Sequence, residues 1–381
     1  MLDHQPDFAQ RIRGVSESKT IKVFSLARRL QQEGRQIISL AVGEPAFDTP
    51  EAVISATRRA LADQHTRYGP VAGLEALRDR LAAGFTGYSS GNIMITNGAK
   101  QALFSIFQIL CNPDDEIIVP QPCWVSFTEQ IKLAGARPVP VETADHQIDP
   151  TAIEKAMTAR TKAILINSPN NPTGAVYARE NLMSLARLAA ARNVYLISDE
   201  AYHAFTYDGR SHQSALESAP DPQRVITVRS FSKHFNMTGF RLGYVAGGAK
   251  LIQSLARLQS HLTGNVCTFA QYGALAALQM DSSVVDKRRA ILQKRRDMAY
   301  ALARERFTCV RAAGAFYLFP DVRSHLRDGE TSEDLAARLL NEAGVAVVPG
   351  EAFHGPGHIR ISFGMSEADL QRAFEKIKEV L

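Results

Sequence analysis

The stretch RSFSKHFNMTGFRLG, residues 229–243, gathers anion-binding groups around a primary amine. Ser230, Ser232 and Lys233 follow directly on an apolar run, and Arg241 comes shortly after them. Hydroxyls and a guanidinium together bind phosphate oxygens well, because the guanidinium offers a bidentate fork. A lysine has a pKa of about 10.4 in water, but burial and neighbouring cations lower that pKa and make the amine a nucleophile. The stretch therefore predicts a phosphate site built around a reactive lysine.

Other polar residues also come directly after apolar runs. In an open α/β sheet, ligands bind at the carboxyl ends of the strands, so we expect these residues to meet at one edge. A helix that starts there with small residues adds free backbone N–H groups for an anion. The residues are Asn97, Gly98, Ala99 and Lys100 after IMIT, Asn171 in the loop PNNPTG (169–174) after AILINS, and Asp199, Glu200 and Tyr202 after VYLIS.

Each of these features has a plain structural explanation when taken alone: a tight turn, a polar loop, a helix N-cap, a core aromatic or a solvated lysine. Their combination is more specific. The Lys233 amine, the Asp199 carboxylate, the Trp124 ring and a phosphate cradle together suit pyridoxal 5′-phosphate, which needs a Schiff-base lysine, a partner for its pyridine nitrogen and an anchor. We predict no metal ligands.

A nucleotide site is the competing explanation for a phosphate cradle. The segment GYVAGGAK (243–250) approaches the spacing of a P-loop but lacks the final Gly-Lys-Ser/Thr. None of the expected strands is followed by G-x-G-x-x-G. The sequence therefore favours pyridoxal phosphate over a nucleotide.

Short β-rich runs alternate with helical patterns and must position these residues. Several runs are continuously apolar, as expected for parallel strands covered on both faces, so we predict an α/β fold. The expected strands are 92–96, 115–120, 136–142, 161–168, 193–200 and 224–230, and the expected helices between them are 100–110, 151–159 and 180–192.

The pattern changes near residue 287 to a long helix, a stretch containing GAFYLFP (314–320) and two further β-rich segments. This predicts a smaller α+β lobe, against which we expect the helical segment 20–34 to pack. We therefore expect a large cofactor-binding domain over residues 48–286 and a discontinuous small domain over residues 1–47 and 287–381.

The composition is that of an ordinary globular protein: 381 residues, 45% hydrophobic and 22% charged. The formal charge is +5, but the densest basic stretch, residues 286–296, is interrupted by apolar residues and fits a solvated helix face better than a nucleic-acid site. Four cysteines without CxxC spacing favour a reducing cytoplasm. The acidic start MLDHQPDFAQ does not fit a signal peptide, and no run fits a membrane span.

With these residues in place, the sequence resembles the class I and II aminotransferases of fold type I, and within them the bacterial aspartate aminotransferases. The resemblance runs from Thr20 to Leu381. It implies a large domain with a mixed, mostly parallel seven-stranded sheet covered by helices, plus a smaller α+β domain. The segments that carry it are GEPAFDTP (43–50), RYGPVAG (67–73), NGAKQALF (97–104), PCWVSF (122–127), NSPNNPTGAVY (167–177), SDEAY (198–202), SFSKHFNMTGFRLG (230–243) and HIRISF (358–363).

The resemblance implies catalytic roles for three residues. Lys233 would bind the cofactor aldehyde and then move the proton at the substrate Cα. Asp199 would keep the pyridine nitrogen protonated, and Tyr202 together with Asn171 would hydrogen-bond the phenolic oxygen. Trp124 would stack on the ring and, like Asn171, border the substrate.

The family also implies the remaining contacts. Arg360 would clasp the α-carboxylate of the substrate, helped by the backbone N–H of Gly43. Lys100 is expected among the cofactor-binding residues beside the phosphate site. It would also bind the distal carboxylate of an acidic substrate or else remain a solvated lysine at a helix start. The phosphate ligands would be Gly98, Ala99, Ser230, Arg241 and, from the neighbouring subunit of a homodimer, Tyr68.

These roles predict a cytoplasmic aminotransferase that moves an amino group by a ping-pong mechanism, with aspartate and 2-oxoglutarate as the expected substrates. Residues 259–269 depart from the aspartate-specific pattern, so aromatic or other amino acids stay open. A lyase, decarboxylase or cyclase with the same cofactor is a second possibility. A DNA-binding regulator built on this fold is a third, which the presence of both Lys233 and Arg360 disfavours.

Overall fold

The structure of the protein is a computed structural model of 381 residues that describes residues 9–17, 19–217 and 219–381. Residues 1–8, which carry the expectation about a signal peptide and begin the expected small domain, lie outside the described residues.

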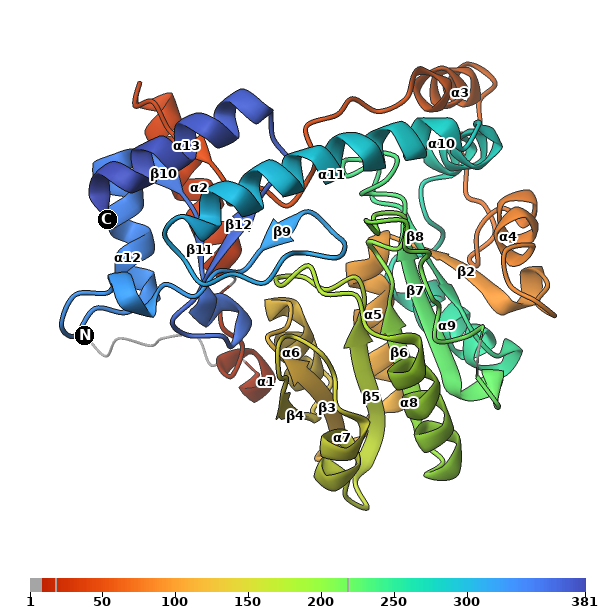
Figure 1. Ribbon diagram of the computed structural model, residues 1–381. Helices are drawn as coiled ribbons and strands as arrows, with labels where there is room; N and C mark the ends of the chain where they lie inside the picture. The colour runs from red at the N-terminus through yellow and green to blue at the C-terminus, as the bar shows by residue number, and fades with distance from the viewer. Residues whose placement is uncertain (1–8, 18, 218) are drawn as a thin grey trace, which may run out of the picture.

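A seven-stranded sheet forms the centre of the larger part of the molecule, in the strand order β2-β8-β7-β6-β5-β3-β4 (Figure 1). Strand β8 runs antiparallel to both of its neighbours, and the other pairs are parallel. The mixed, mostly parallel sheet expected from the sequence is thereby confirmed. The strands are β2 (Ile93–Thr96), β3 (Glu116–Gln121), β4 (Arg137–Glu142), β5 (Thr161–Asn167), β6 (Tyr195–Asp199), β7 (Val225–Ser230) and β8 (Gly243–Ala246).

Helices cover both faces of this sheet because its central strands are apolar on both sides. Every residue of β2 and β8 is buried, and β5, β6 and β7 are buried almost throughout. The three helices expected between the strands are present as α5, α7 and α8. The helices of this part are α3 (Glu51–Ala62), α4 (Glu75–Ala82), α5 (Gly98–Leu110), α6 (Val125–Leu133), α7 (Pro150–Ala156), α8 (Arg179–Ala191), α9 (Ala249–Leu262) and α10 (Thr268–Gln279).

A second, smaller α+β region packs its own apolar core beside the sheet (Figure 1). Its three-stranded antiparallel sheet joins β11, β12 and β9, and a separate parallel pair joins β1 to β10. The elements are α1 (Gln10–Arg13), α2 (Lys19–Gln32), β1 (Ile38–Ser39), α11 (Ser283–Arg304), β9 (Tyr317–Leu318), α12 (Ser332–Arg338), β10 (Val345–Ala346), β11 (Val348–Pro349), β12 (Ile359–Ser362) and α13 (Glu367–Val380).

Polar side chains fix the starts of several helices in both regions. The Asp149 carboxylate accepts from Thr151 N ahead of Pro150, and Thr331 and Asp334 cap each other reciprocally at α12. The short helices are η1 (Ser90–Asn92), η2 (Pro222–Arg224), η3 (Arg323–His325), the π-helical turn η4 (Leu339–Ala343) and η5 (Gly350–Phe353).

The β1–β10 pair ties the N-terminal part of the chain to its C-terminal part. Ile38 pairs with Val345 and Ser39 with Ala346, so residues far apart in sequence form one element. Helix α2 also packs here, against β10 and β11, as expected for segment 20–34.

The expected boundaries of the large domain, at residues 48 and 286, stay a prediction. In the described part of the chain, no helix combines the length and the apolar character that crossing a membrane requires.

Candidate active site

A cavity of about 310 Å³ lies where β5, β6 and β7 end and α5 begins. The residues predicted for the site converge on it although they come from many parts of the chain. Those that line it are Gly43, Ala99, Lys100, Trp124, Asn171, Asp199, Tyr202, Ser230, Lys233, Arg241 and Arg360.

Two predicted residues are placed differently. Gly98 does not line the cavity but begins α5 directly beneath Arg241. Tyr68 is 99% exposed and lies outside the cavity, so this chain alone gives it no role in the site.

Lys233 reaches the cavity from the turn that follows β7. Its Nζ donates a hydrogen bond to the carbonyl oxygen of Gly43 at 2.7 Å. Burial lowers the pKa of Lys233 to about 8; Arg360 and Arg241 act in the same direction, whereas Glu44 and Asp199 oppose it. A substantial share of the amine is therefore neutral near physiological pH, as a nucleophile or general base requires.

Asp199 ends β6 and is 4% exposed. One carboxylate oxygen accepts from Ala201 N at 3.0 Å, and the register places Asp199 beside Asn167 of β5. Burial raises the pKa of Asp199 to about 7, against the opposing effects of the Ala201 N–H and Lys233. A cation brought into the cavity beside this carboxyl group would favour its ionised form.

Arg360 enters from β12 and is 4% exposed. Its Nη1 donates to Asn171 Oδ1 and its Nη2 to Ala41 O, each at 2.9 Å, while the buried Nε has no hydrogen-bond partner. Its guanidinium lies 4.4 Å from the ring centre of Tyr317. Burial lowers the pKa of Arg360, and no described residue forms a salt bridge with it.

The start of α5 and the turn before β8 fit closely together. Gly98 has φ +79°, and a Cβ there would lie 2.7 Å from Arg241 Nη2. A Cβ at Gly243 would lie 2.7 Å from Ala99 N. The two glycines therefore let the Arg241 guanidinium approach the N-terminal N–H groups of a 13-residue helix, an arrangement that binds anions.

Lys100 and Trp124 also line the cavity. Lys100 Nζ lies 5.0 Å from the centre of the Trp124 ring, within cation–π distance. Burial, followed by the charge of Arg241, lowers the pKa of Lys100. This part of the cavity thus combines an aromatic face with positive charge.

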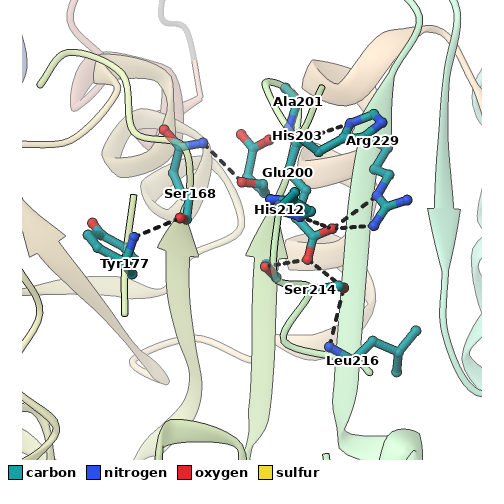
Figure 2. Close-up of polar contacts among 12 residues, drawn as sticks. Ser168, Tyr177, Glu200, Ala201, His203, His212, Ser214, Leu216 and Arg229 are labelled. Atoms are coloured by element: carbon teal, nitrogen blue, oxygen red, sulfur yellow. Dashed lines mark hydrogen bonds and ion pairs between the residues drawn. The ribbon is translucent and has the colours of Figure 1, made fainter. Parts of the chain in front are cut away.

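A second polar cluster surrounds Glu200, the residue that follows Asp199 (Figure 2). We call Glu200, Arg229, His212, Ser198 and Ser214 the Glu200 cluster. Glu200 is completely buried, and the four other members of the cluster donate to its carboxylate at 2.7–3.0 Å. Burial opposes the charge of Glu200, but Arg229, His212 and Ser214 outweigh it and lower the pKa to about 2.

His203 connects this cluster to the lysine turn. Its Nδ1 lies 3.0 Å from Glu200 O, and its ring packs 4.8 Å from that of His234. Because Glu200 follows Asp199 and His234 follows Lys233, His203 connects the residue after Asp199 with the residue after Lys233. Sequence reasoning noted Glu200 only as a neighbour of Asp199 and did not identify the cluster.

Sequence reasoning also missed several residues that line the cavity. Tyr317 was seen only as part of the stretch 314–320, although a tyrosine in a buried strand needs a partner for its hydroxyl, which was the available signal. Ile21 and Phe24 were assigned only to a packing helix. The lining residues outside the predicted set are Thr20, Ile21, Phe24, Ala41, Asn167, Ala201 and Tyr317, while Ser232 of the opening stretch lines the cavity as expected.

The fold and the arrangement of residues around the cavity are those of a known protein family. A family model described as aminotransferase class I and II matches residues 35–377, and the chain belongs to this family. The predicted family and an aminotransferase activity are thereby confirmed.

Particular relatives are similar over nearly the whole chain. An aspartate aminotransferase of Geobacillus stearothermophilus is 38% identical, over 97% of this chain and 97% of that protein. An aspartate/prephenate aminotransferase of Thermus thermophilus is 40% identical, over 98% of each chain. A solved Thermus thermophilus aspartate aminotransferase with maleate superposes with a TM-score of 0.94 at 40% identity, covering 99% of this chain and 100% of that one.

Proposed function

We propose that the protein is a pyridoxal-phosphate aminotransferase whose preferred amino donor is aspartate and whose acceptor is 2-oxoglutarate. One observation carries the proposal. Lys233, Asp199 and Arg360 line the same cavity, and none of them forms a salt bridge with another described residue. Charged groups that face a cavity without internal counter-charges are costly, so their counter-charges are expected to come from outside the chain.

The residues present fit pyridoxal phosphate. Asp199 would hold a proton on the ring nitrogen, and this cation would offset the effect of burial on the carboxyl group. Asn171 and Tyr202 would bind the phenolic oxygen, and Trp124 would cover the ring. The phosphate would meet the start of α5 together with Ser230 and Arg241, where Gly98 leaves the necessary space.

When bound, the cofactor supplies an aldehyde that condenses with amines and a ring that withdraws electrons from the substrate Cα. Lys233 carries out the proton transfers. With its pKa near 8, the amine would accept the proton from the substrate Cα and donate a proton again without a large energetic penalty in either direction. Asp199 would keep the ring nitrogen protonated during this exchange, and Tyr202 would stabilise the phenolic oxygen.

Arg360 and the N–H of Gly43 would orient the substrate through its α-carboxylate. The unpartnered Nε of Arg360 is the donor that such a carboxylate would satisfy. Lys100 would then meet the distal carboxylate of a dicarboxylic substrate. The aspartate in the relatives' names and the maleate in the Thermus structure support this class of substrate.

A broader donor range is the second candidate. Ile21 and Phe24 of α2 border the cavity and are 55% and 43% exposed, so they offer an apolar surface to an aromatic side chain. The Thermus relative named for both aspartate and prephenate supports an enzyme of mixed range.

A half-reaction screen tests the proposal. The purified protein is loaded with pyridoxal phosphate, and each amino acid is added while conversion to the pyridoxamine form is followed by absorbance. We expect aspartate and glutamate to convert it fastest, with Lys233→Ala unreactive. Failure of every amino acid would overturn transamination, and elimination or decarboxylation products would support the lyase alternative instead.

We also propose a homodimer in which Tyr68 completes the phosphate site of the partner subunit. The full exposure of Tyr68 in the single chain supports this. Mixing Tyr68→Phe with Lys233→Ala subunits should restore one intact site in each hybrid dimer, and no recovery of activity would contradict the shared site.

A cytoplasmic location is proposed from the four free cysteines, and domain boundaries at residues 48 and 286 are proposed from the sequence pattern.

A further inference from the structure

Tyr317 of β9 lines the cavity and is 0% exposed. Its ring centre lies 4.4 Å from the Arg360 guanidinium, which is also 5.0 Å from the Phe353 ring. Its hydroxyl lies 3.1 Å from the Tyr202 hydroxyl. The one side chain therefore contacts a residue proposed to bind substrate and a residue proposed to bind cofactor.

These contacts close into a circuit of four residues. Arg360 Nη1 donates to Asn171 Oδ1 at 2.9 Å, and Asn171 Nδ2 donates to the Tyr202 hydroxyl at 3.4 Å. Tyr202 then meets Tyr317, whose ring returns to Arg360. Because Arg360 can only donate, the Asn171 oxygen must face it, and the Asn171 amide group must face Tyr202.

The donor and acceptor count leaves two arrangements for the hydrogen bond between Tyr202 and Tyr317, in which either hydroxyl is the donor. A phenol has one proton and two lone pairs. If Tyr202 accepts from both Asn171 and Tyr317, its own proton is left to donate into the cavity. If Tyr202 donated to Tyr317 instead, it would have no proton for a cofactor oxygen.

We propose that Tyr317 is a positioning residue with two separable functions, an inference that rests on the proposed function. Its hydroxyl donates to Tyr202 and directs the Tyr202 proton toward the phenolic oxygen of the cofactor. Its ring holds the Arg360 guanidinium in place for the substrate carboxylate. Tyr317 thereby couples the cofactor side of the site to the substrate side.

The test separates the hydroxyl from the ring. In Tyr317→Phe, the loss of one donor makes Tyr202 a weaker donor to the phenolic oxygen, which becomes more basic. The pH midpoint of the absorbance change of the lysine-bound cofactor should shift upward by about half a pH unit. The KM for the amino donor should stay within about twofold of wild type, because the ring remains.

Removing the ring should add a second effect. In Tyr317→Leu, or in Tyr317→Met if the leucine variant does not fold, the KM should rise by about tenfold, because a buried cation–π contact is lost. The spectral midpoint should shift as it does in the phenylalanine variant. Recovery of KM by phenylalanine, without recovery of the midpoint, is the signature of the two functions.

Tyr207 offers a matched control within the same chain. It is 1% exposed, its hydroxyl donates to Ala315 O, and its ring lies 5.0 Å from the Arg296 guanidinium, but it does not line the cavity. Tyr207→Phe loses a buried hydroxyl contact of the same kind and should move neither the midpoint nor KM.

The outcomes are distinct. An unmoved midpoint in Tyr317→Phe overturns the role of the hydroxyl, and an unmoved KM in both non-aromatic variants overturns the role of the ring. A shift of the same size in Tyr207→Phe would mean that general loosening is the cause, which also overturns the proposal. A wild-type protein that binds no pyridoxal phosphate would instead refute the proposed function itself.

Discussion

Arg229 of β7, which is mostly buried, and Arg360 of β12, which is buried, lie in two different sheets and have opposite surroundings. Arg229 meets the Glu200 carboxylate through Nε and Nη2 at 3.0 and 2.8 Å. Arg360 meets an amide oxygen and a backbone carbonyl, and its Nε has no hydrogen-bond partner. Burial opposes both charges, but Tyr244 and Glu200 raise the pKa of Arg229, whereas the pKa of Arg360 is lowered.

This difference distinguishes arginines that stabilise the fold from an arginine that is available to bind a ligand. Two other buried arginines also meet carboxylates inside the chain: Arg296 binds Asp208 and Asp297, and Arg338 binds Glu330. A buried charge whose counter-charge belongs to the fold contributes to structure, and removing either partner is costly. Arg360 lacks such a partner among the described residues, which is the condition expected of a site for an external carboxylate.

The largest predicted effect concerns the stability of the Glu200 cluster. Glu200→Ala leaves Arg229 buried without its carboxylate, and we expect the free energy of unfolding to fall by about 3–5 kcal/mol. Urea denaturation measures this. Glu154→Ala is the control, because Glu154 and Arg192 form an exposed pair that contributes about 0–1 kcal/mol.

The double variant Glu200→Met, Arg229→Met sharpens this result. It removes both charges, so it should be more stable than Glu200→Ala. A double variant as unstable as the single one would show that the cluster stabilises the protein by more than charge pairing.

Removing Arg360 should have the opposite pattern. Arg360→Leu eliminates a buried cation that has no carboxylate partner among the described residues, so the free energy of unfolding should not fall. The value of kcat/KM should drop more than 100-fold for every amino donor, which corresponds to about 3 kcal/mol of lost transition-state binding. Steady-state kinetics with several donors and urea denaturation together check this. A loss of stability as large as that of Arg229→Leu would break the comparison.

The pH dependence of stability offers a third test. The pKa of Glu200 is about 2 in the folded protein, below its usual value near 4.5, so its contribution is present above pH 4.5 and is lost as the pH falls toward 2. Over this window the wild type should lose on the order of 2 kcal/mol more than Glu200→Gln, which cannot titrate. Parallel curves for the two proteins would contradict the assignment.

The smallest effect is on the reactivity of Lys233. Its pKa is about 8, and the charge of Arg360 contributes to this depression, after burial. The rate of reaction with pyridoxal phosphate should therefore rise with pH around a midpoint near 8, and Arg360→Leu should move the midpoint upward by a fraction of a unit. The Glu200→Met, Arg229→Met variant should leave it in place.

The sequence predicted those parts of the molecule whose signal is local. Continuous apolar runs located most strands of the large sheet, and polar residues after them located Lys233, Asp199 and Asn171. Strand β8 was missed because it is four residues long, begins at Gly243 and is followed by two further glycines. Glycine-rich sequence is depleted in strands, and here the sheet imposes the strand conformation.

The parts that could not be predicted depend on contacts between distant segments. His212 and Ser214 reach Glu200 from a loop with no periodicity, and nothing in their own sequence indicates a buried carboxylate nearby. Tyr317 acquires its role only because β9 places it beside Tyr202 and Arg360. Such positions are set by tertiary packing, which local pattern does not encode.

The β1–β10 pair has a consequence for the order in which the site is completed during synthesis. The residues around Lys233 and Asp199 emerge from the ribosome well before Arg360, and Ala41, which accepts from Arg360, emerges earliest of all. Residues 38–39 must wait for residues 345–346 before they are held in place. A nascent chain can therefore form the strands that carry Lys233 and Asp199 first, and the contacts of Lys233 with Gly43 and of Arg360 with Ala41 are completed only with the last part of translation.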